Sequence, residues 1–307
     1  MERKKINIGI IGIGYLGKFH LEKFINNKHC NDIYAVDNNI ETLKSLKIAD
    51  IVKIKDYKRI INDIDAVSIV TPTKLHYKIA KYFLTNKKHV LIEKPMTERV
   101  SEAKKLIDIA KKNQLILQVG HLERFNPVMK KLQTEIKKPV FIEVHRLSKF
   151  NIRSTDVNVI FDLMIHDIDI VSTLVNKKIK SIVAFGKKII TNSIDIANVR
   201  IEFHGGTIAN LTASRISQKN ERKIRIFEQE RYHSVDFMNS VINSYTRNIS
   251  NKKKLFNYKK YTYKKADSLK NEIENFIMSC LKKEKPLVDG NQGLTAVEVA
   301  TIISKQL

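Results

Sequence analysis

The chain has 307 residues, and 43% of them are hydrophobic, which excludes a globally disordered protein because a chain of this composition can bury a core. The formal net charge is +24, mostly from lysine spread along the whole sequence. Two distant cysteines, Cys30 and Cys280, exclude a disulfide framework and fit a reducing compartment. No run approaches the roughly 20 apolar residues of a membrane helix. We therefore expect a cytoplasmic protein.

The first 120 residues alternate short apolar runs with amphipathic stretches. Continuous apolar runs are typical of parallel strands covered on both faces. Alternation of such strands with helices predicts a doubly wound parallel sheet. The expected strands are 6–12, 33–37, 65–73, 89–95 and 115–121, and the clearest helices are 15–27 and 74–86.

A glycine pattern lies between the first expected strand and the first expected helix. Gly12, Gly14 and Gly17 have the G-x-G-x-x-G spacing, and the next strand ends at Asp37, twenty residues after Gly17. Such glycines allow a tight turn and a close approach of the backbone to a pyrophosphate at the helix N-terminus. A carboxylate at Asp37 would accept hydrogen bonds from the ribose and repel a 2′-phosphate. The pattern predicts NAD rather than NADP.

A second motif follows the strand at 89–93. The stretch HVLIEKPMT places Glu93, Lys94 and Pro95 at the carboxyl end of that strand, the edge where open α/β sheets bind ligands. A lysine delivered there can hold a substrate hydroxyl and stabilise the alkoxide as it forms. By itself, Lys94 would be an ordinary lysine at a strand end.

After about residue 122 the periodicity changes to two-residue alternation, which predicts a C-terminal α+β domain with a large, mostly antiparallel, open-faced sheet. Gly205 and Gly206 mark a hairpin turn. The expected strands are 139–148, 178–186, 197–217 with that hairpin, and 222–237, and helices are expected at 266–283 and 293–307. We expect a dinucleotide-binding domain at 1–121, a substrate-binding and oligomerisation domain at 122–290, and a C-terminal helix at 291–307 that packs on the first domain.

The stretch FDLMIHDID, residues 161–169, places a histidine and three carboxylates in an apolar run. If it is helical, Asp162, His166 and Asp169 share one face. Buried ionisable groups are costly unless they are paired or used. A histidine titrates near neutral pH and can accept the proton of a carbinol, and a carboxylate can fix its tautomer. The alternative is a core histidine satisfied by a neighbouring aspartate.

Taken together, these motifs resemble the Gfo/Idh/MocA family of NAD(P)-dependent sugar oxidoreductases. The resemblance covers GIIGIGYLGKFH, VSIVTPTKLHYKIA, EKP, and DLMIHDID, which matches D-x-x-x-H-x-x-D. It implies that His166 is the catalytic base, that Asp162 orients it, that Lys94 binds the reacting hydroxyl, and that Asp169 is a supporting or structural carboxylate. The implied cofactor-binding residues are Gly12, Gly14, Tyr15, Leu16, Gly17, Asp37, Asn38, Thr71, Pro72, His76, Glu93 and Lys94. Unlike many relatives, VNVIFDLMIHD contains no glycine, which predicts a bulkier pocket floor.

Two further segments bear on the substrate. VGHLERFNP, residues 119–127, offers Arg124 and Asn126 for a sugar or phosphate, although Arg124 equally suits a salt bridge at a domain junction. Arg153 in NIRST is a second candidate for an anionic substrate. Within the family, the resemblance points to the branch that oxidises the 3-hydroxyl of UDP-N-acetylglucosamine and supplies a PLP aminotransferase. It also implies a homodimer or homotetramer, formed through the open face of the sheet.

Alternatives remain from the sequence alone. The substrate can be another sugar, a polyol or inositol, and a non-catalytic NAD-sensing regulator can use the same fold. Asp162, His166 and Asp169 can in principle ligate iron, but a nicotinamide scaffold needs no metal and we expect none. The lysine-rich stretch 252–265 can bind a polyanion, although an exposed edge segment is favoured. No recognised nucleic-acid module is present, so we expect no specific nucleic-acid partner.

Overall fold

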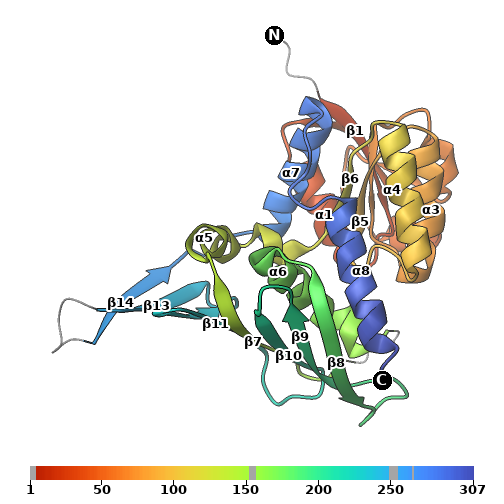
Figure 1. The fold of residues 1–307 in the computed structure, drawn as a ribbon. Helices are drawn as coiled ribbons and strands as arrows, with labels where there is room; N and C mark the ends of the chain where they lie inside the picture. Colours follow the sequence, from red (N-terminus) through yellow and green to blue (C-terminus); the bar gives the residue numbers. More distant parts are fainter. Residues whose placement is uncertain (1–4, 152–156, 249–254, 265) are drawn as a thin grey trace. The chain divides into compact units, whose positions relative to one another are not determined.

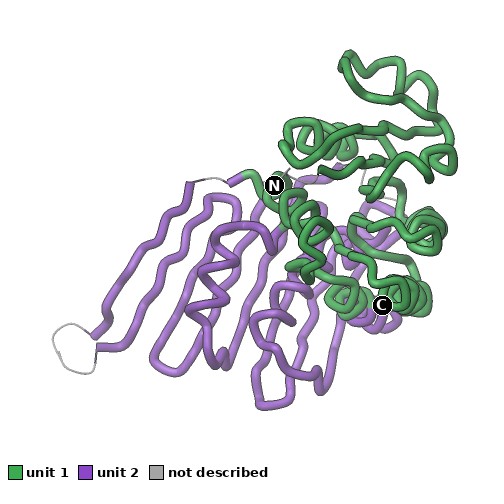
Figure 2. The backbone as a smooth tube through the Cα atoms, turned by 90° about the horizontal axis from the view of Figure 1, so that it is seen from above, with its two compact units in different colours: residues 1–122, 267–297 green, residues 123–266, 298–307 purple. Residues whose placement is uncertain are grey.

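The computed structural model describes residues 5–151, 157–248, 255–264 and 266–307. The chain divides into two compact units, coloured separately in Figure 2. Unit 1 comprises residues 1–122 and 267–297, and unit 2 comprises residues 123–266 and 298–307. Within the described ranges, the helices are all too short or too polar to span a lipid bilayer.

Unit 1 is built on a six-stranded parallel sheet with the strand order β3-β2-β1-β4-β5-β6. Figure 1 shows α3 and α4 together on one face of this sheet and α1 on the other. The strands are β1 (Ile6–Ile11), β2 (Cys30–Val36), β3 (Val52–Ile54), β4 (Ala66–Ile69), β5 (His89–Glu93) and β6 (Leu117–Gly120). The helices are α1 (Tyr15–Ile25), α2 (Ile40–Lys44), α3 (Thr73–Thr85), α4 (Val100–Lys112) and α7 (Ser268–Lys282), with a 3-10 turn at Tyr57–Ile60.

Helix α7 completes the core of unit 1 although it follows most of unit 2 in the chain. Its apolar face is Ile273, Phe276, Ile277 and Cys280, and these side chains join the cluster that contains Leu21 of α1 and residues of β1 and β2. The sequence pattern predicts one domain over residues 122–290. The structure instead groups α7 with the dinucleotide-binding unit, because that helix buries its apolar face there.

Unit 2 contains an eight-stranded sheet with the order β14-β13-β12-β11-β7-β10-β9-β8. Among its described strands, only β7 and β10 pair in parallel. The strands are β7 (Pro139–Leu147), β8 (Ile179–Lys187), β9 (Ile196–Phe203), β10 (Ile208–Ser214), β11 (Glu221–Glu228), β12 (Arg231–Asp236), β13 (Val241–Arg247) and β14 (Phe256–Thr262). Helices α5 (Pro127–Glu135) and α6 (Ile165–Val175), together with the π-helix η4 (Ile160–Met164), contribute apolar side chains to its core cluster. A 3-10 turn, η2 (Leu122–Phe125), leads into this unit.

The sheet of unit 2 carries a row of aromatic rings that crosses five neighbouring strands. Successive ring centroids lie 4.8–5.9 Å apart. The rings belong to Phe141, Phe227, Tyr232, Tyr245 and Tyr258. The last two rings are 36% and 51% exposed, so the row lies on a face of the sheet that its own helices leave uncovered.

The predicted fold class is confirmed: a parallel α/β unit is followed by an α+β unit with a mostly antiparallel sheet. Three strands were not predicted, namely β3, β13 and β14. Strand β14 is the edge of its sheet, and it is formed from described residues of the lysine-rich stretch 252–265.

Helix α8 (Gly290–Ser304) begins in unit 1 and ends in unit 2. A Cβ atom on Gly293 would lie 2.6 Å from Val119 of β6, so this helix approaches the unit 1 sheet closely where it begins. Val299, Ala300 and Ile303 belong to the core cluster of unit 2. The expected C-terminal helix therefore packs on the first domain only through its first half.

Candidate active site

The glycine loop between β1 and α1 has the geometry that a dinucleotide requires. Gly12 has a φ of +93°, and a Cβ there would lie 2.6 Å from the carbonyl oxygen of Val70. A Cβ on Gly17 would lie 1.9 Å from the carbonyl oxygen of Gly12. Around a Cβ on Gly14, in contrast, no atom of the described residues lies within 4 Å, apart from Gly14 itself and its chain neighbours. The first and third glycines are thus needed for packing, and the second leaves open space at the N-terminus of α1 for a pyrophosphate.

Asp37 lies beside this loop, directly after β2. Its Oδ2 accepts a hydrogen bond from the backbone nitrogen of Ile13 at 2.8 Å, and its Oδ1 accepts one from the backbone nitrogen of Asn39 at 2.9 Å. The carboxylate is half-buried, so it keeps access to a ligand. Asn38 is exposed next to it, as are Tyr15 and Leu16 at the start of α1. These groups fit the adenosine half of NAD.

His76 connects the two remaining loops at this edge of the sheet. Its Nδ1 lies 2.9 Å from the carbonyl oxygen of Pro95, and its Nε2 lies 2.8 Å from that of Thr71. Burial lowers the pKa of His76, and the contacts with the two carbonyl oxygens oppose that shift. His76 was predicted to bind the cofactor. His76 is 1% exposed, which indicates a structural role. It holds the loop after β4, which contains Pro72, and the loop after β5 in their conformations. Direct contact with NAD stays a prediction.

Glu93 ends β5 and precedes Lys94, which is joined to Pro95 by a cis peptide bond. The Glu93 Oε1 lies 3.1 Å from Nε2 of His20, and its Oε2 accepts a hydrogen bond from the backbone nitrogen of Lys94 at 3.3 Å. Burial alone would raise the pKa of Glu93, but His20 and Lys94 hold it below its usual value. Glu93 is therefore an anion that fixes the backbone from which Lys94 extends. His20 is itself buried and is also hydrogen-bonded to Ser68, so it is a structural residue.

The stretch 161–169 is helical, but it begins with the π-helix η4 and becomes α-helical at Ile165. The side-chain oxygen of Asn158 accepts hydrogen bonds from the backbone nitrogens of Ile160 and Phe161 at the start of this segment. Because a π-turn has more residues than an α-turn, the constant helical repeat from which a single stripe of Asp162, His166 and Asp169 was expected does not hold across Ile160–Met164. Asp162 and His166 are both half-buried, and π-helical turns are frequent at functional sites.

The environment of Asp169 differs from that of Asp162 and His166. It is buried, and its Oδ1 lies 3.3 Å from Nη1 of Arg124, which also donates to Oγ1 of Thr173. Arg124 thus forms the salt bridge that is the alternative to substrate binding. Asn126 caps α5 by accepting from the backbone nitrogen of Val128 at 3.0 Å and is also buried. Contacts of these two residues with substrate stay predictions that their burial disfavours. Arg153 lies outside the described residues.

One polar network near the site was not anticipated. Arg146 of β7 donates to both carboxylate oxygens of Asp167 at 2.8 Å, and it lies 3.3 Å from Glu123, which also binds Arg222. All of these except Arg222 are nearly fully buried. Asp167 directly follows His166, so the network anchors α6 to the sheet. The signal available in the sequence was a charged residue, Arg146, in an alternating strand.

Two family models match the chain. One, described as the oxidoreductase family with an NAD-binding Rossmann fold, matches residues 6–121. The other, described as the GFO/IDH/MocA C-terminal domain, matches residues 137–231.

Individual relatives are similar over nearly the full length. The UDP-N-acetylglucosamine 3-dehydrogenase of Acidithiobacillus ferrooxidans is 34% identical over 298 residues, covering 95% of this chain and 94% of the relative. A solved structure of that enzyme aligns with a TM-score of 0.90 at 32% identity, over 99% of this chain and 98% of that one. The myo-inositol 2-dehydrogenase of Thermotoga maritima is 25% identical, covering 98% of this chain and 96% of the relative. A scyllo-inositol dehydrogenase of Lactobacillus casei, solved with bound NAD(H) and scyllo-inositol, shares the fold at 20% identity and a TM-score of 0.83, over 99% of this chain and 97% of that one.

Proposed function

The chain belongs to the Gfo/Idh/MocA family of NAD-dependent oxidoreductases, and we propose that it oxidises one hydroxyl of a nucleotide sugar to a ketone. The observation that carries this proposal is the 34% identity to a UDP-N-acetylglucosamine 3-dehydrogenase over 95% of the chain. Asp162 and His166 add the chemistry that such a reaction needs. The residues around the glycine loop fit NAD, which supplies the hydride acceptor when it is bound.

The roles of the side chains follow from the reaction. A carbinol carbon can lose hydride only if its hydroxyl loses a proton. His166 accepts that proton, since an imidazole titrates near neutral pH. Asp162, four residues earlier, orients the imidazole and stabilises its cationic form. The ammonium group of Lys94 binds the same hydroxyl and stabilises its developing negative charge.

The substrate that we propose is UDP-N-acetylglucosamine, oxidised at its 3-hydroxyl. The resulting 3-keto sugar is a substrate for a PLP aminotransferase, which would install an amine and give a 2,3-diamino sugar nucleotide of the kind used in lipid A. In support, the relative that acts on this sugar matches this chain from end to end in both sequence and fold.

A second candidate is the oxidation of inositol or another cyclic polyol, which the similarity to the myo-inositol 2-dehydrogenase favours. A non-catalytic NAD sensor is the alternative from a different class, and the retained Lys94, Asp162 and His166 disfavour it.

A substrate panel with NAD, read by the absorbance of NADH, separates these candidates. We expect turnover with UDP-N-acetylglucosamine and none with inositol or free sugars. Because the equilibrium of ketone formation is unfavourable, the assay includes an aminotransferase and glutamate in one arm. Turnover restricted to inositol would overturn the nucleotide-sugar assignment, and tight NAD binding without turnover on any polyol would identify a sensor. An unchanged rate after treatment with a chelator is expected, since no step requires a metal.

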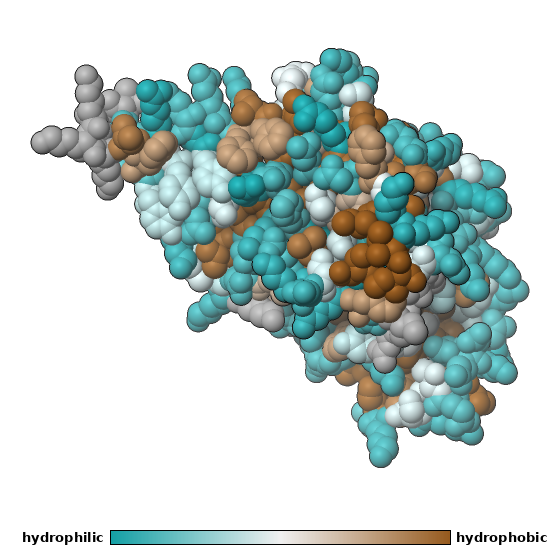
Figure 3. Space-filling view, turned by 90° about the horizontal axis from the view of Figure 1, so that it is seen from below, coloured by the Kyte–Doolittle hydropathy of each residue, from teal (hydrophilic) through white to brown (hydrophobic). Residues whose placement is uncertain are grey.

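We also propose that the protein forms homodimers or homotetramers through the uncovered face of the unit 2 sheet. The aromatic row on that sheet supports this assembly, because exposed apolar surface commonly marks an interface. Figure 3 shows hydrophobic side chains, in brown, gathered on the face seen from below. Exposed apolar residues also occur on and after β8, namely Val183, Phe185, Ile189 and Ile190. Sedimentation of the wild type and of Tyr245→Lys tests this assembly, and an unchanged oligomer in the variant would contradict it.

A further inference from the structure

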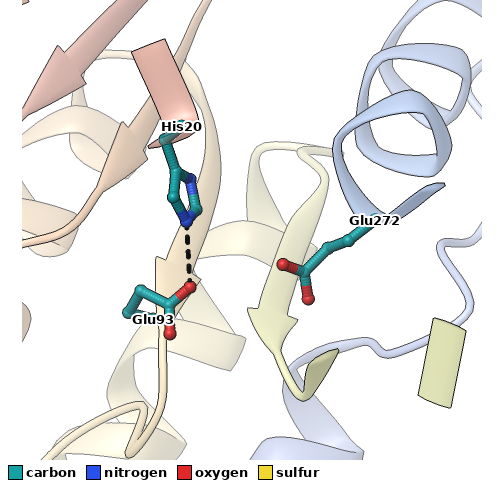
Figure 4. A group of neighbouring side chains, drawn as sticks. All are labelled: His20, Glu93 and Glu272. Atoms are coloured by element: carbon teal, nitrogen blue, oxygen red, sulfur yellow. Dashed lines mark hydrogen bonds and ion pairs between the residues drawn. The ribbon is translucent and has the colours of Figure 1, made fainter. Parts of the chain in front are cut away.

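A buried carboxyl group on α7 has no hydrogen-bond partner in the part of the chain that the structure describes. Glu272 is 0% exposed, and neither of its carboxylate oxygens is hydrogen-bonded to any described residue. An ionised carboxylate in this position would lack the donors that compensate for its removal from water. Figure 4 shows that Glu272 points from α7 toward Glu93 and His20.

These three side chains form one compact cluster within unit 1. Each contributes one nitrogen or oxygen atom to a group in which all atoms lie within 4.8 Å of one another. Glu93 already has His20 and the backbone of Lys94 as donors, whereas Glu272 has none among the described residues. A Cβ on Gly120 would lie 2.8 Å from Oε1 of Glu93, so a larger residue there would force the Glu93 carboxylate to move from this position. What the cluster lacks at Glu272 is a hydrogen-bond donor.

One proton on Glu272 supplies that donor. Two carboxylates held close together in a buried site do not both ionise, and one of them keeps a proton. Burial and the negative charge of Glu93 raise the pKa of Glu272 well above its usual value, whereas His20 and Lys94 keep the pKa of Glu93 low. The two groups are therefore driven to opposite protonation states.

We propose that Glu272 is a neutral carboxylic acid that donates its proton to Glu93, and that it acts with His20 as a positioning residue for the Glu93–Lys94 segment. Glu93 then receives donors from α1, from α7 and from the backbone nitrogen of Lys94. The effect on Lys94 rests on the function proposed above, whereas the protonation state of Glu272 does not.

A bound cation is the alternative way to satisfy the cluster. Both ring nitrogens of His20 are already engaged, Nδ1 with Oγ of Ser68 at 2.9 Å and Nε2 with Glu93 at 3.1 Å. A metal ion would have to displace the second of these contacts. A proton removes the buried charge of Glu272 without displacing any contact, and it is the smaller addition.

The proposal predicts a specific dependence of stability on pH. The folded pKa of Glu272 is above the unfolded value, so its contribution is fully present below the unfolded pKa and is lost as pH rises through the folded pKa. Each pH unit in that window lowers the folded-to-unfolded ratio by up to about tenfold. The titratable groups clustered with Glu272 are His20 of α1 and Glu93 of β5, which Lys94 follows. Lys23 of α1 is paired with Asp267 at the N-cap of α7, and β6 presents the uncharged Gln118.

The experiment compares unfolding of the wild type, Glu272→Gln and Glu284→Gln across pH. The amide introduced by Glu272→Gln can still donate to Glu93 but cannot ionise, so we expect the stability of this variant to fall less as pH rises. The Glu284→Gln control, which changes an exposed carboxylate just beyond α7, should follow the wild type. Parallel curves for the wild type and Glu272→Gln would overturn the proposal.

Two further measurements test whether a protonated Glu272 is the cause of this pH dependence. The infrared band of a protonated carboxylic acid should be present in the wild type at neutral pH and absent in Glu272→Gln. Metal analysis of the purified protein should find no bound equivalent. Absence of the band, or one metal ion per chain that is lost in Glu272→Gln, would each overturn the proposal.

The positioning role is tested by turnover on the NAD-dependent substrate. Glu272→Ala should lower kcat by about tenfold to a hundredfold through misplacement of Lys94, Glu272→Gln should restore it, and the high-pH decline of the wild-type profile should be reduced in Glu272→Gln. Equal activity of the Ala and Gln variants would remove the positioning role. If the wild type turns over no substrate, the proposed function fails, while the infrared and stability measurements still decide the state of Glu272.

Discussion

The guanidinium of Arg124 lies 3.3 Å from the carboxylate of Asp169, and the two side chains are only 3% and 4% exposed. Arg124 belongs to η2, where the chain enters unit 2, and Asp169 belongs to α6, one turn after His166. The pair therefore fixes the helix that carries the proposed base to the entry segment of the same unit. Because its charge is already paired with Asp169, Arg124 has a structural role, and binding of substrate is not its first role.

Replacing Arg124 by Gln should destabilise the protein by about 3–5 kcal/mol, because it leaves the buried Asp169 charge without its partner. Denaturant unfolding measures this. Arg247→Gln is the matched control, since its pair with Glu230 is 64% and 40% exposed and should contribute little. If Arg124→Gln instead keeps its stability and raises only the KM for a nucleotide sugar, the residue contacts substrate.

The glycine loop offers a matched pair of substitutions. Gly14→Ala should leave the melting temperature unchanged, since its φ is −69° and its Cβ position is open, but it should lower NAD affinity by occupying the space left for the pyrophosphate. Gly17→Ala should lower both, because its Cβ would collide with the Gly12 carbonyl. Calorimetric titration with NAD and thermal unfolding separate the two effects. Wild-type NAD affinity in Gly14→Ala would place the pyrophosphate elsewhere.

Asp37→Ala should weaken NAD binding and reduce discrimination against NADP, since the carboxylate that repels a 2′-phosphate is removed. We expect the ratio of NADP to NAD affinity to rise by about tenfold or more, as binding titrations with each cofactor would measure. Asp32→Ala, which changes an exposed carboxylate on β2, is the control. An unchanged cofactor preference would remove Asp37 from the ribose site.

His166→Ala and Lys94→Ala should each lower turnover by about a hundredfold to ten-thousandfold while NAD binding survives, because each removes a group that acts on the reacting hydroxyl. Steady-state kinetics and NAD titration measure the two properties. His145→Ala, which changes a half-exposed histidine of unit 2, should be active. Loss of NAD binding in both site variants would show that the assigned roles are wrong.

The sequence predicted the parts of the fold where one physical signal dominates. The central strands of unit 1 are buried on both faces, so their apolar runs were visible, and the hairpin at Gly205 and Gly206 was visible from its turn residues. Strand β14 was missed because nearly all of its residues are exposed, so no buried apolar pattern marks it, and its pairing with β13 is a tertiary effect. The assignment of α7 to unit 1 was also missed, since an amphipathic pattern shows that a face is buried but not where.

The candidate site, like the fold, was predictable only in part. Gly12, Gly14, Gly17 and Asp37 meet at one loop as their spacing indicated. The π-turn at Ile160–Met164 was not predictable, because helical periodicity assumes a constant turn, and the capping by Asn158 that accompanies it is local geometry. Glu272 was equally invisible, since it lies 179 residues beyond Glu93 in the sequence (272 − 93) and only folding brings the two together.

The late position of α7 in the chain has a consequence for biosynthesis. While the ribosome is still producing unit 2, Ile273, Phe276 and Ile277 of α7 have not yet been made. The apolar surface around Leu21 that they cover in the folded protein is therefore exposed to water. A translation product that stops near residue 122 should thus be a client for chaperones rather than a free-standing nucleotide-binding module. Unit 1 is thus the first part of this enzyme to be synthesised, but it can complete its core only after α7 has been made.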